Sequence, residues 1–202
     1  MKLYFAPGAC SLAAHILVLE SDLPCALERV DLATHKTAQG DDYRTLNPKG
    51  YVPALVLANG ELLTEASVVL QYLSDQKPEA GLMSAPGTLP RYRQLEWLSF
   101  IATEIHKQFS PLFRPETHAK TRGAQRDALG RRFTYLCERL KDRPYLMGEA
   151  FTAPDAYLFT VLNWTGFVKI DLAPWPRLGD YLATIRARPS VERALRAEGL
   201  IA

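Results

Sequence analysis

The spacing of apolar residues changes repeatedly along the first 77 positions, as it does where strands and helices alternate. Short runs in which apolar and polar residues alternate predict strands, and longer runs with apolar residues three or four apart predict helices. The predicted strands cover residues 2–5, 25–32, 53–57 and 61–64; the predicted helices cover 11–21 and 65–76, with a polar stretch of modest helical potential at 37–47.

Two of these strands flank Ala58-Asn59-Gly60, a sequence that favours a tight hairpin turn. The two hairpin strands should pair antiparallel, whereas strands joined through a helix should pair in parallel. The first part of the chain is therefore expected to form an α/β domain, with a mixed four-stranded sheet covered by helices.

The second part of the chain has no convincing strand pattern and consists of helical runs. These runs follow residues 78–90, where three prolines and two glycines indicate a linker. The predicted helices cover residues 91–113, 122–142, 152–168 and 177–190. The predicted organisation is an α/β domain at 1–80, a linker at 81–88 and an all-helical domain at 89–202.

The predicted helix at 152–168 is nearly all apolar, as expected of a central buried helix. Thr152 and Asp155 have the spacing of a capping box at its start, with Asp in place of the usual Glu. Pro154 lies in the first turn, where proline is tolerated. Tyr157 and Trp164 are expected to be core residues.

Composition excludes several classes of function. Of the 202 residues, 48% are hydrophobic and 23% are charged, and the formal net charge is +2. These values are ordinary for a globular protein and too weakly basic for a nucleic-acid-binding surface. No apolar run approaches the ~20 residues that span a bilayer, and the opening residues do not form a signal peptide. We therefore expect a cytoplasmic protein without nucleic-acid or membrane partners, in which disulfides are rare.

The three cysteines are far apart, and with only four histidines the chain is not expected to hold a structural metal site. Cys25 and Cys137 lie in patterns where packing is the default role. Cys10 stands at the junction of a predicted strand and a predicted helix, where N–H groups and the helix dipole lower a thiol pKa below its usual ~8.5. The sequence leaves open whether Cys10 is a functional thiol or a small buried side chain, and no neighbouring cysteine is present for a local disulfide.

The later part of the first domain has features of a binding site for a short peptide. Proline within sheets is confined largely to edges and strand starts, so Pro53 predicts an exposed edge where a peptide could pair with the backbone of Val52. Glu65 precedes a predicted helix whose first turn holds Ala66 and Ser67. That helix start offers N–H donors to a carboxylate, and Glu65 could hold an ammonium group. Each feature also has a structural alternative, a strand start for Pro53 and a favourable first-turn acid for Glu65.

Six stretches of the chain together resemble cytosolic glutathione transferases, and specifically the bacterial beta class. They are MKLYFAPGACSLAAHI, VDL…GDDY…NPKGYVPAL, LLTEASVVLQYL, EWLSFIATEIHK.FSPLFRP, APDAYLFTVL.W and LRAEGLI, and they cover nearly the whole chain in order. The resemblance implies a thioredoxin-like N-terminal domain, an all-helical C-terminal domain that binds the electrophile, and a homodimer with active sites near the subunit interface. It also implies a cis peptide bond before Pro53.

The resemblance assigns roles to individual residues along the bound tripeptide. Cys10, next to Ala9, would face the sulfur of glutathione, and the Val52 backbone ahead of Pro53 would pair with the cysteinyl part. At position 35 relatives commonly have a lysine that meets the glycyl end. This chain has His35, which makes the charge there dependent on pH.

Glu65 and the Ala66 amide would hold the γ-glutamyl end. Ala66 replaces a glycine that is common in relatives, and a backbone contact tolerates this change. His106 and Lys107, in the predicted helix at 91–113, would approach the sulfur and the second substrate.

The partner subunit is implied to contribute Ser99, Thr103 and Glu104. With α-helical periodicity, Ser99 and Thr103 lie on the same face of their predicted helix as His106. This polar strip beside an apolar stripe suits the wall of a cleft.

The implied function is detoxification by a glutathione transferase. Its glutathione thiolate would attack an electrophilic carbon of an apolar compound, including dehalogenation, and helix-start donors and His106 would stabilise that thiolate. A mixed disulfide between Cys10 and glutathione would add thiol-transfer or peroxidase activity. Glutathione is then a co-substrate, and no permanently bound cofactor is expected. Two alternatives stay open, a non-catalytic ligand carrier and a monothiol glutaredoxin-like reductase.

Overall fold

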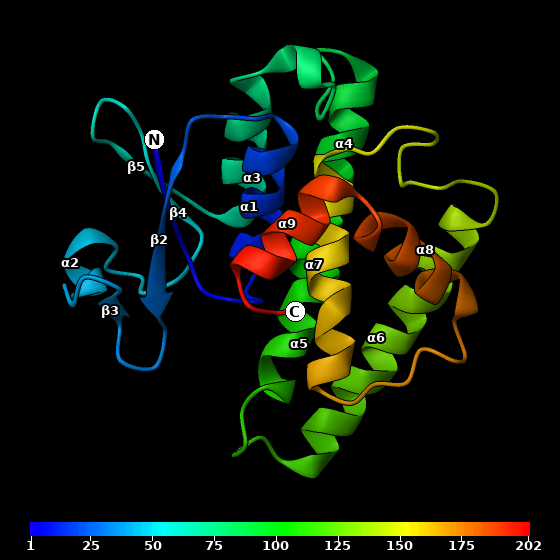
Figure 1. The fold of residues 1–202 in the computed structure, drawn as a ribbon. Coiled ribbons are helices and arrows are strands. Elements are labelled where there is room, and N and C mark those ends of the chain that lie inside the picture. The colour runs from blue at the N-terminus through cyan, green and yellow to red at the C-terminus, as the bar shows by residue number, and fades with distance from the viewer. The chain divides into compact units, whose positions relative to one another are not determined.

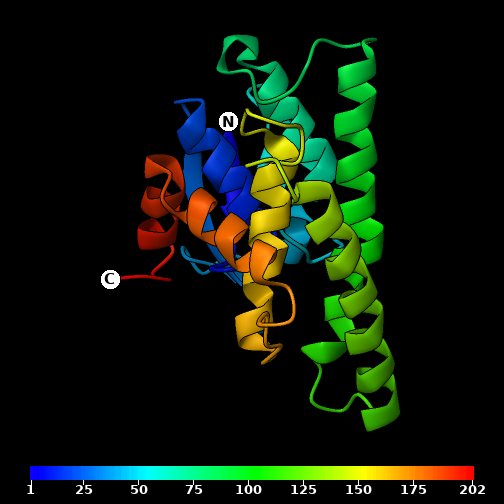
Figure 2. The same ribbon diagram turned by 90° about the vertical axis from the view of Figure 1, so that its right-hand side faces the viewer.

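In a computed structural model that describes residues 1–202, the chain folds into two compact units. One consists of Met1–Ser84 together with Arg188–Ala202, and the other of Ala85–Ala187 (Figures 1 and 2). The first carries a sheet and the second is helical, which confirms the predicted fold class. No helix is both long enough and apolar enough to cross a membrane.

The first unit is built on a five-stranded sheet in the order β3-β2-β1-β4-β5. β1 and β2, which are joined through a helix, pair in parallel, and the hairpin strands β4 and β5 pair antiparallel, so these two predicted directions are confirmed. β4 also pairs antiparallel with β1, which the sequence pattern does not predict. The strands are β1 (Lys2–Phe5), β2 (Ala26–Asp31), β3 (Lys36–Thr37), β4 (Ala54–Val56) and β5 (Leu62–Thr64).

The sheet has one strand more than the four expected from the sequence. The additional strand, β3, pairs antiparallel with β2. The stretch at 37–47 forms only the short helix α2 (Tyr43–Leu46) instead of a longer polar helix. Gly40 turns the chain with a φ of +91°, and the Asp42 side chain caps α2 by accepting from Arg44 N at 3.0 Å.

Helix α1 is the centre of the first unit. The helices of this unit, besides α2, are α1 (Ser11–Glu20), α3 (Ala66–Asp75), the 3₁₀ turn η1 (Pro78–Ala80) and α9 (Pro189–Ala197). α1 packs against β1, α3 and α9, and residues 11–18 are all buried (Figure 1). Packing on several sides explains why its sequence is apolar nearly all round.

The C-terminal residues belong to the first unit. The sequence prediction assigns 188–202 to the helical domain, but α9 buries Val191 and Leu195 and packs on α1. Its start is held by the Glu20 carboxylate at the end of α1, which binds Arg188 and Ser190. Only long-range packing decides this assignment, because an amphipathic helix carries no local mark of which core it covers.

The second unit is arranged around the buried helix α7, which contacts α4, η2 and α8 (Figure 2). The predicted single helix at 91–113 consists of α4, a π-helical segment η2, a short α5 and the 3₁₀ turn η3. The helices are α4 (Leu89–Phe100), η2 (Ile101–His106), α5 (Lys107–Phe109), η3 (Ser110–Leu112), α6 (Ala119–Leu140), α7 (Ala153–Phe167) and α8 (Pro176–Arg186).

Asp155 connects the start of α7 to two other segments of the second unit. It completes the predicted capping box, accepting from Thr152 N at 2.9 Å and from the Thr152 hydroxyl at 2.8 Å. It also accepts from Leu146 N at 2.8 Å and from Tyr181 Oη of α8 at 2.9 Å. Burial raises the pKa of this carboxyl above its ordinary value, and the donors act in the opposite direction.

Asp155→Ala should lower the free energy of unfolding by at least about 3 kcal/mol, because several buried donors lose their common acceptor. Urea denaturation followed by circular dichroism measures this loss. Asp127→Ala, at an exposed position of α6, is the matched control and should change stability by less than about 0.5 kcal/mol. Equal stabilities of the two variants would contradict the role assigned to Asp155.

Candidate active site

Cys10 stands directly before α1, after a tight turn that leads out of β1. The turn is closed by a bond from Ala9 N to Ala6 O at 3.0 Å and by Ser11 Oγ, which accepts from Ala6 N at 3.1 Å. Gly8 has a φ of +71°, a conformation that favours glycine. Cys10 is therefore the N-cap residue of α1, beside the N–H groups of its first turn.

The Cys10 thiol reaches the segment that precedes β4. Its Sγ donates to the carbonyl oxygen of Val52 at 3.0 Å, and the side chain is partly buried. Ala9 packs on the same apolar cluster as Val52 and Tyr43. This contact joins the two parts of the chain that the sequence singles out for peptide binding.

The other two cysteines differ from Cys10 in their surroundings. Cys25 precedes β2 and Cys137 lies in α6, and both are free thiols. Burial raises the pKa of each thiol above its ordinary value. Burial therefore favours the protonated form of both thiols.

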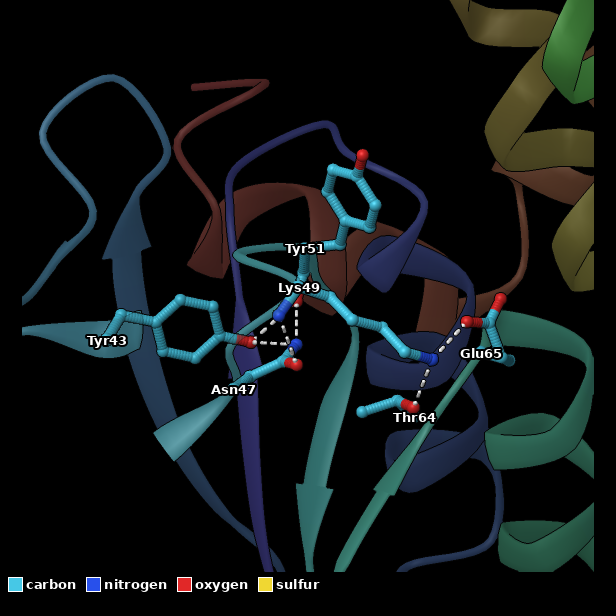
Figure 3. A network of polar contacts seen from close by, with 6 residues as sticks. All are labelled: Tyr43, Asn47, Lys49, Tyr51, Thr64 and Glu65. Carbon is cyan, nitrogen blue, oxygen red and sulfur yellow. Dashed lines mark hydrogen bonds and ion pairs between the residues drawn. The ribbon is translucent and has the colours of Figure 1, made fainter. Parts of the chain in front are cut away.

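Side-chain donors fix the backbone immediately before Val52. Tyr43 Oη donates to the Tyr51 carbonyl at 2.7 Å, and Asn47 Nδ2 donates to the same oxygen at 2.8 Å (Figure 3). The Val52–Pro53 peptide bond is cis, as the resemblance implies. Two successive carbonyls are thus held by side chains: that of Tyr51 from α2 and its C-terminal end, and that of Val52 from Cys10 before α1.

The prediction that Pro53 marks an exposed edge of the sheet is wrong. β4 lies inside the sheet between β1 and β5, so Pro53 stands at a strand start, which is the alternative that the sequence leaves open. The pairing of β4 with β1 ends at Ala54, opposite Tyr4. Val52 therefore lies past the end of this ladder and not along a side edge of the sheet.

Glu65 connects β5 to α3 in an unusual conformation, with φ +71° and ψ +119°. Few residues other than glycine adopt a positive φ. Its carbonyl caps α3 by accepting from Val69 N at 2.9 Å, but its carboxylate makes no capping bond. The carboxylate instead pairs with Lys49 Nζ at 2.7 Å, and the same Nζ donates to Thr64 Oγ1 at 3.1 Å (Figure 3). Sequence reasoning did not identify Lys49.

His35 lies next to the loop that carries Lys49 and Tyr51. Its φ is +54°, and its carbonyl accepts from Tyr43 N at 2.8 Å. The imidazole lies so close to Gly50 that a Cβ atom there would be 3.0 Å from His35 Cε1. The buried Nδ1 atom has no hydrogen-bond partner. The structure thus brings His35 to the same loop as Val52.

His106 ends the π-helix η2 in the second unit. Its Nδ1 is 2.7 Å from Tyr157 Oη, and its ring meets that of Trp164 edge-on, with centroids 4.7 Å apart. Both partners are buried on α7, as predicted for core residues, but they also orient His106. A bond from Tyr157 to Nδ1 leaves the ring proton on Nε2 as a donor. A buried tyrosine hydroxyl needs a partner, which is the one signal that could have predicted this contact.

The π-helix changes which residues share the face of His106. Its N–H groups bond five residues back instead of four, so α-helical periodicity does not hold across residues 101–106. Thr103 Oγ1 donates to the Ser99 carbonyl at 3.0 Å, and both residues are exposed. The Glu104 carboxylate is held by Arg132 of α6 through two bonds, one from Nε at 2.9 Å. The α-helical periodicity from which the strip Ser99 to His106 was predicted therefore does not apply in this segment.

The predicted site residues form two groups, each within one unit. The first unit holds Ala9, Cys10, His35, Val52, Pro53, Glu65 and Ala66; the second holds Ser99, Thr103, Glu104, His106 and the exposed Lys107. No group of three or more His, Cys, Asp or Glu side chains could hold a metal ion.

Two family models match this chain. They are "Glutathione S-transferase, N-terminal domain" over residues 8–76 and "Glutathione S-transferase, C-terminal domain" over residues 100–189. The chain belongs to the glutathione S-transferase family. This confirms the resemblance drawn from the sequence motifs, and it means that the protein is an enzyme of the glutathione transferase type.

Similar proteins that match nearly the whole of this chain support its assignment to the family. It is 46% identical over 200 residues to glutathione S-transferase GstA of Escherichia coli O157:H7, covering 99% of this chain and 100% of that protein. A sphingomonad glutathione S-transferase complexed with glutathione is 45% identical, with a TM-score of 0.95 and 100% coverage of both chains. A bacterial beta-class glutathione S-transferase of Sphingomonas chungbukensis is 46% identical, with a TM-score of 0.96 and the same coverage.

In this transferase the C-terminal segment also holds the turn that precedes Cys10. Glu198, just after α9, accepts from Gly8 N at 2.8 Å through Oε2. Its Oε1 is 2.9 Å from Nδ1 of His15 on α1, and both side chains are almost completely buried. One carboxylate therefore joins the Cys10 turn, the middle of α1 and the end of the chain.

Glu198→Ala should lower the free energy of unfolding by at least about 2 kcal/mol, because it leaves buried donors unpaired. The loosened turn should also increase the rate at which iodoacetamide alkylates Cys10 at pH 7, measured by mass spectrometry of the peptides. Cys25 and Cys137 serve as internal references, since burial raises the pKa of both thiols. Glu192→Ala removes an exposed α9 carboxylate paired with Arg196 and should alter neither quantity appreciably. If both variants matched the wild type, the role of Glu198 would be rejected.

Proposed function

We propose that this transferase joins reduced glutathione to apolar electrophiles, with glutathione bound along Val52. The observation that supports this most directly is the 3.0 Å contact between Cys10 Sγ and the Val52 carbonyl. A cysteinyl residue that pairs antiparallel with Val52 uses both the N–H and the carbonyl of Val52. Its thiol would then stand beside Cys10 at the start of α1. The relative from a sphingomonad is itself complexed with glutathione.

This proposal gives each end of the tripeptide a partner of suitable chemistry. The γ-glutamyl end has an ammonium, which Glu65 would bind, and a carboxylate, which the Ala66 amide at the start of α3 would bind. His35, against Gly50, would meet the glycyl carboxylate. These three contacts, together with Val52, describe one extended peptide with a charge at each end.

The chemical step is thiolate attack. The N–H groups at the start of α1 favour a negative sulfur, and in this proposal His106 and Lys107 add donors from the second unit. Lowering a thiol pKa from about 8.5 to about 6.5 would increase the thiolate fraction at pH 7 from a few per cent to about three quarters. With an aromatic chloride, the S–C bond forms, the C–Cl bond breaks and chloride leaves with the bonding electrons.

Cys10 also supports a second, thiol-transfer activity. The Cys10 thiolate would attack the glutathionyl sulfur of a mixed disulfide, which forms Cys10–S–S–glutathione and releases the other thiolate. A second glutathione thiolate would then attack the glutathionyl sulfur of this intermediate, which releases oxidised glutathione and frees Cys10. The conjugation step needs no covalent bond to Cys10.

Conjugation is tested by retention on immobilised glutathione and by turnover of 1-chloro-2,4-dinitrobenzene. The wild type should be retained and should release chloride with formation of the thioether. Glu65→Gln should increase the KM for glutathione by about tenfold with little change in kcat, because it removes a charge that the ammonium binds in both ground and transition state. Retention without turnover would favour the ligand carrier, and no retention would refute the proposed site.

Cys10→Ala should separate the two activities. Conjugation should remain within about tenfold of the wild type, since the helix-start donors stay in place. Reduction of the mixed disulfide between glutathione and 2-mercaptoethanol should disappear, because Cys10 can no longer take over the glutathionyl group. Cys25→Ala is the control and should retain both activities. Loss of conjugation together with thiol transfer would mean that the Cys10 sulfur itself is needed in both reactions.

A further inference from the structure

Lys49 forms an ion pair with the Glu65 carboxylate, the same group that is proposed to bind the ammonium of glutathione. Its Nζ is 2.7 Å from Glu65 Oε1 and 3.1 Å from Thr64 Oγ1, so two neighbouring acceptors at the end of β5 hold one cation (Figure 3). A substrate ammonium has the same charge and the same donors as a lysine side chain. The protein thus carries an internal group with the chemistry of the ligand's own terminus.

Hydrogen bonds fix the backbone around Lys49, which holds its side chain within reach of Glu65. Asn47 Oδ1 accepts from Lys49 N at 3.2 Å, and the Asn47 carbonyl accepts from Gly50 N at 2.8 Å. The same Asn47 donates to the Tyr51 carbonyl at 2.8 Å. Lys49 therefore extends from the very loop whose backbone is proposed to pair with the cysteinyl part of glutathione.

The ion pair is accessible and therefore weak. The Lys49 side chain is 50% exposed and that of Glu65 is 64% exposed, so water and ligands reach both groups. Exposed ion pairs stabilise proteins only slightly, because solvent screens the charges and long side chains lose freedom. A ligand can displace Lys49, and the displacement has a small but measurable cost.

We propose that Lys49 is a built-in competitor of the substrate ammonium at Glu65, an inference that rests on the proposed function. Lys49 neutralises Glu65 while the site is free. When glutathione binds, its ammonium either replaces Lys49 or shares the carboxylate with it, and in the shared case two like charges repel each other. In both cases Lys49 weakens glutathione binding and reduces the preference of the site for ligands that carry the ammonium.

The test is isothermal titration calorimetry of the full chain with glutathione and with a glutathione analogue in which hydrogen replaces the α-ammonium. Lys49→Gln should bind glutathione about two- to fivefold more tightly than the wild type, the range expected for loss of an exposed competing ion pair. Lys49→Arg keeps the charge and should bind like the wild type. Lys49→Gln should leave the affinity for the analogue unchanged, because the analogue has no ammonium group to bind the Glu65 carboxylate. Lys120→Gln, an exposed position at the start of α6, controls for the change in net charge.

The outcomes separate this inference from the function on which it rests. Wild-type binding with equal or weaker binding by Lys49→Gln would overturn the competitor role and leave the proposed function standing. The same gain for the analogue as for glutathione would also overturn it, because Lys49 would then act on another part of the ligand. No binding of glutathione by any variant would refute the proposed function and this inference together.

Discussion

The candidate site depends on the fixed backbone just before β4. The Tyr51 carbonyl is held by Tyr43 and Asn47, and the Val52 carbonyl is held by Cys10. These bonds set both the direction of the backbone and the position of the Cys10 thiol. A shift of this backbone therefore also displaces the thiol. A peptide that pairs with such a segment meets a backbone that is already ordered, which reduces the entropy lost on binding. Val52 can serve in this way because β4 pairs with β1 only from Ala54 onward.

Buried carboxylates connect distant segments in both units. Asp155 accepts from two loop or cap positions and from α8, and Glu198 joins the Cys10 turn to α1 and to the C-terminal end. A buried carboxylate is costly unless donors surround it, so each of these groups is stable only when all of its segments are in place. The conformation before Cys10 thus depends on residues from the opposite end of the chain.

Much of the fold was predictable because its signals are local. The hairpin at Ala58-Asn59-Gly60, the capping box of Thr152 and Asp155, and the direction of strand pairing all follow from residues within a few positions. The errors occurred where local patterns are ambiguous. The polar stretch at 37–47 carries helix-compatible residues, but only Tyr43–Leu46 are helical, and its first residue belongs to β3. The apolar spacing through 101–106 fits an α-helix as well as the π-helix that forms.

By itself, the sequence determined the types of most elements, the family and the position of Cys10 before a helix, because capping, periodicity and motifs depend on neighbouring residues. Only the tertiary structure decided the partners: Val52, 42 residues from Cys10; Tyr157, 51 residues from His106; and Gly8, 190 residues from Glu198. Several residues of suitable chemistry compete for each such contact. The choice among them depends on how strands and helices pack, which no local pattern records.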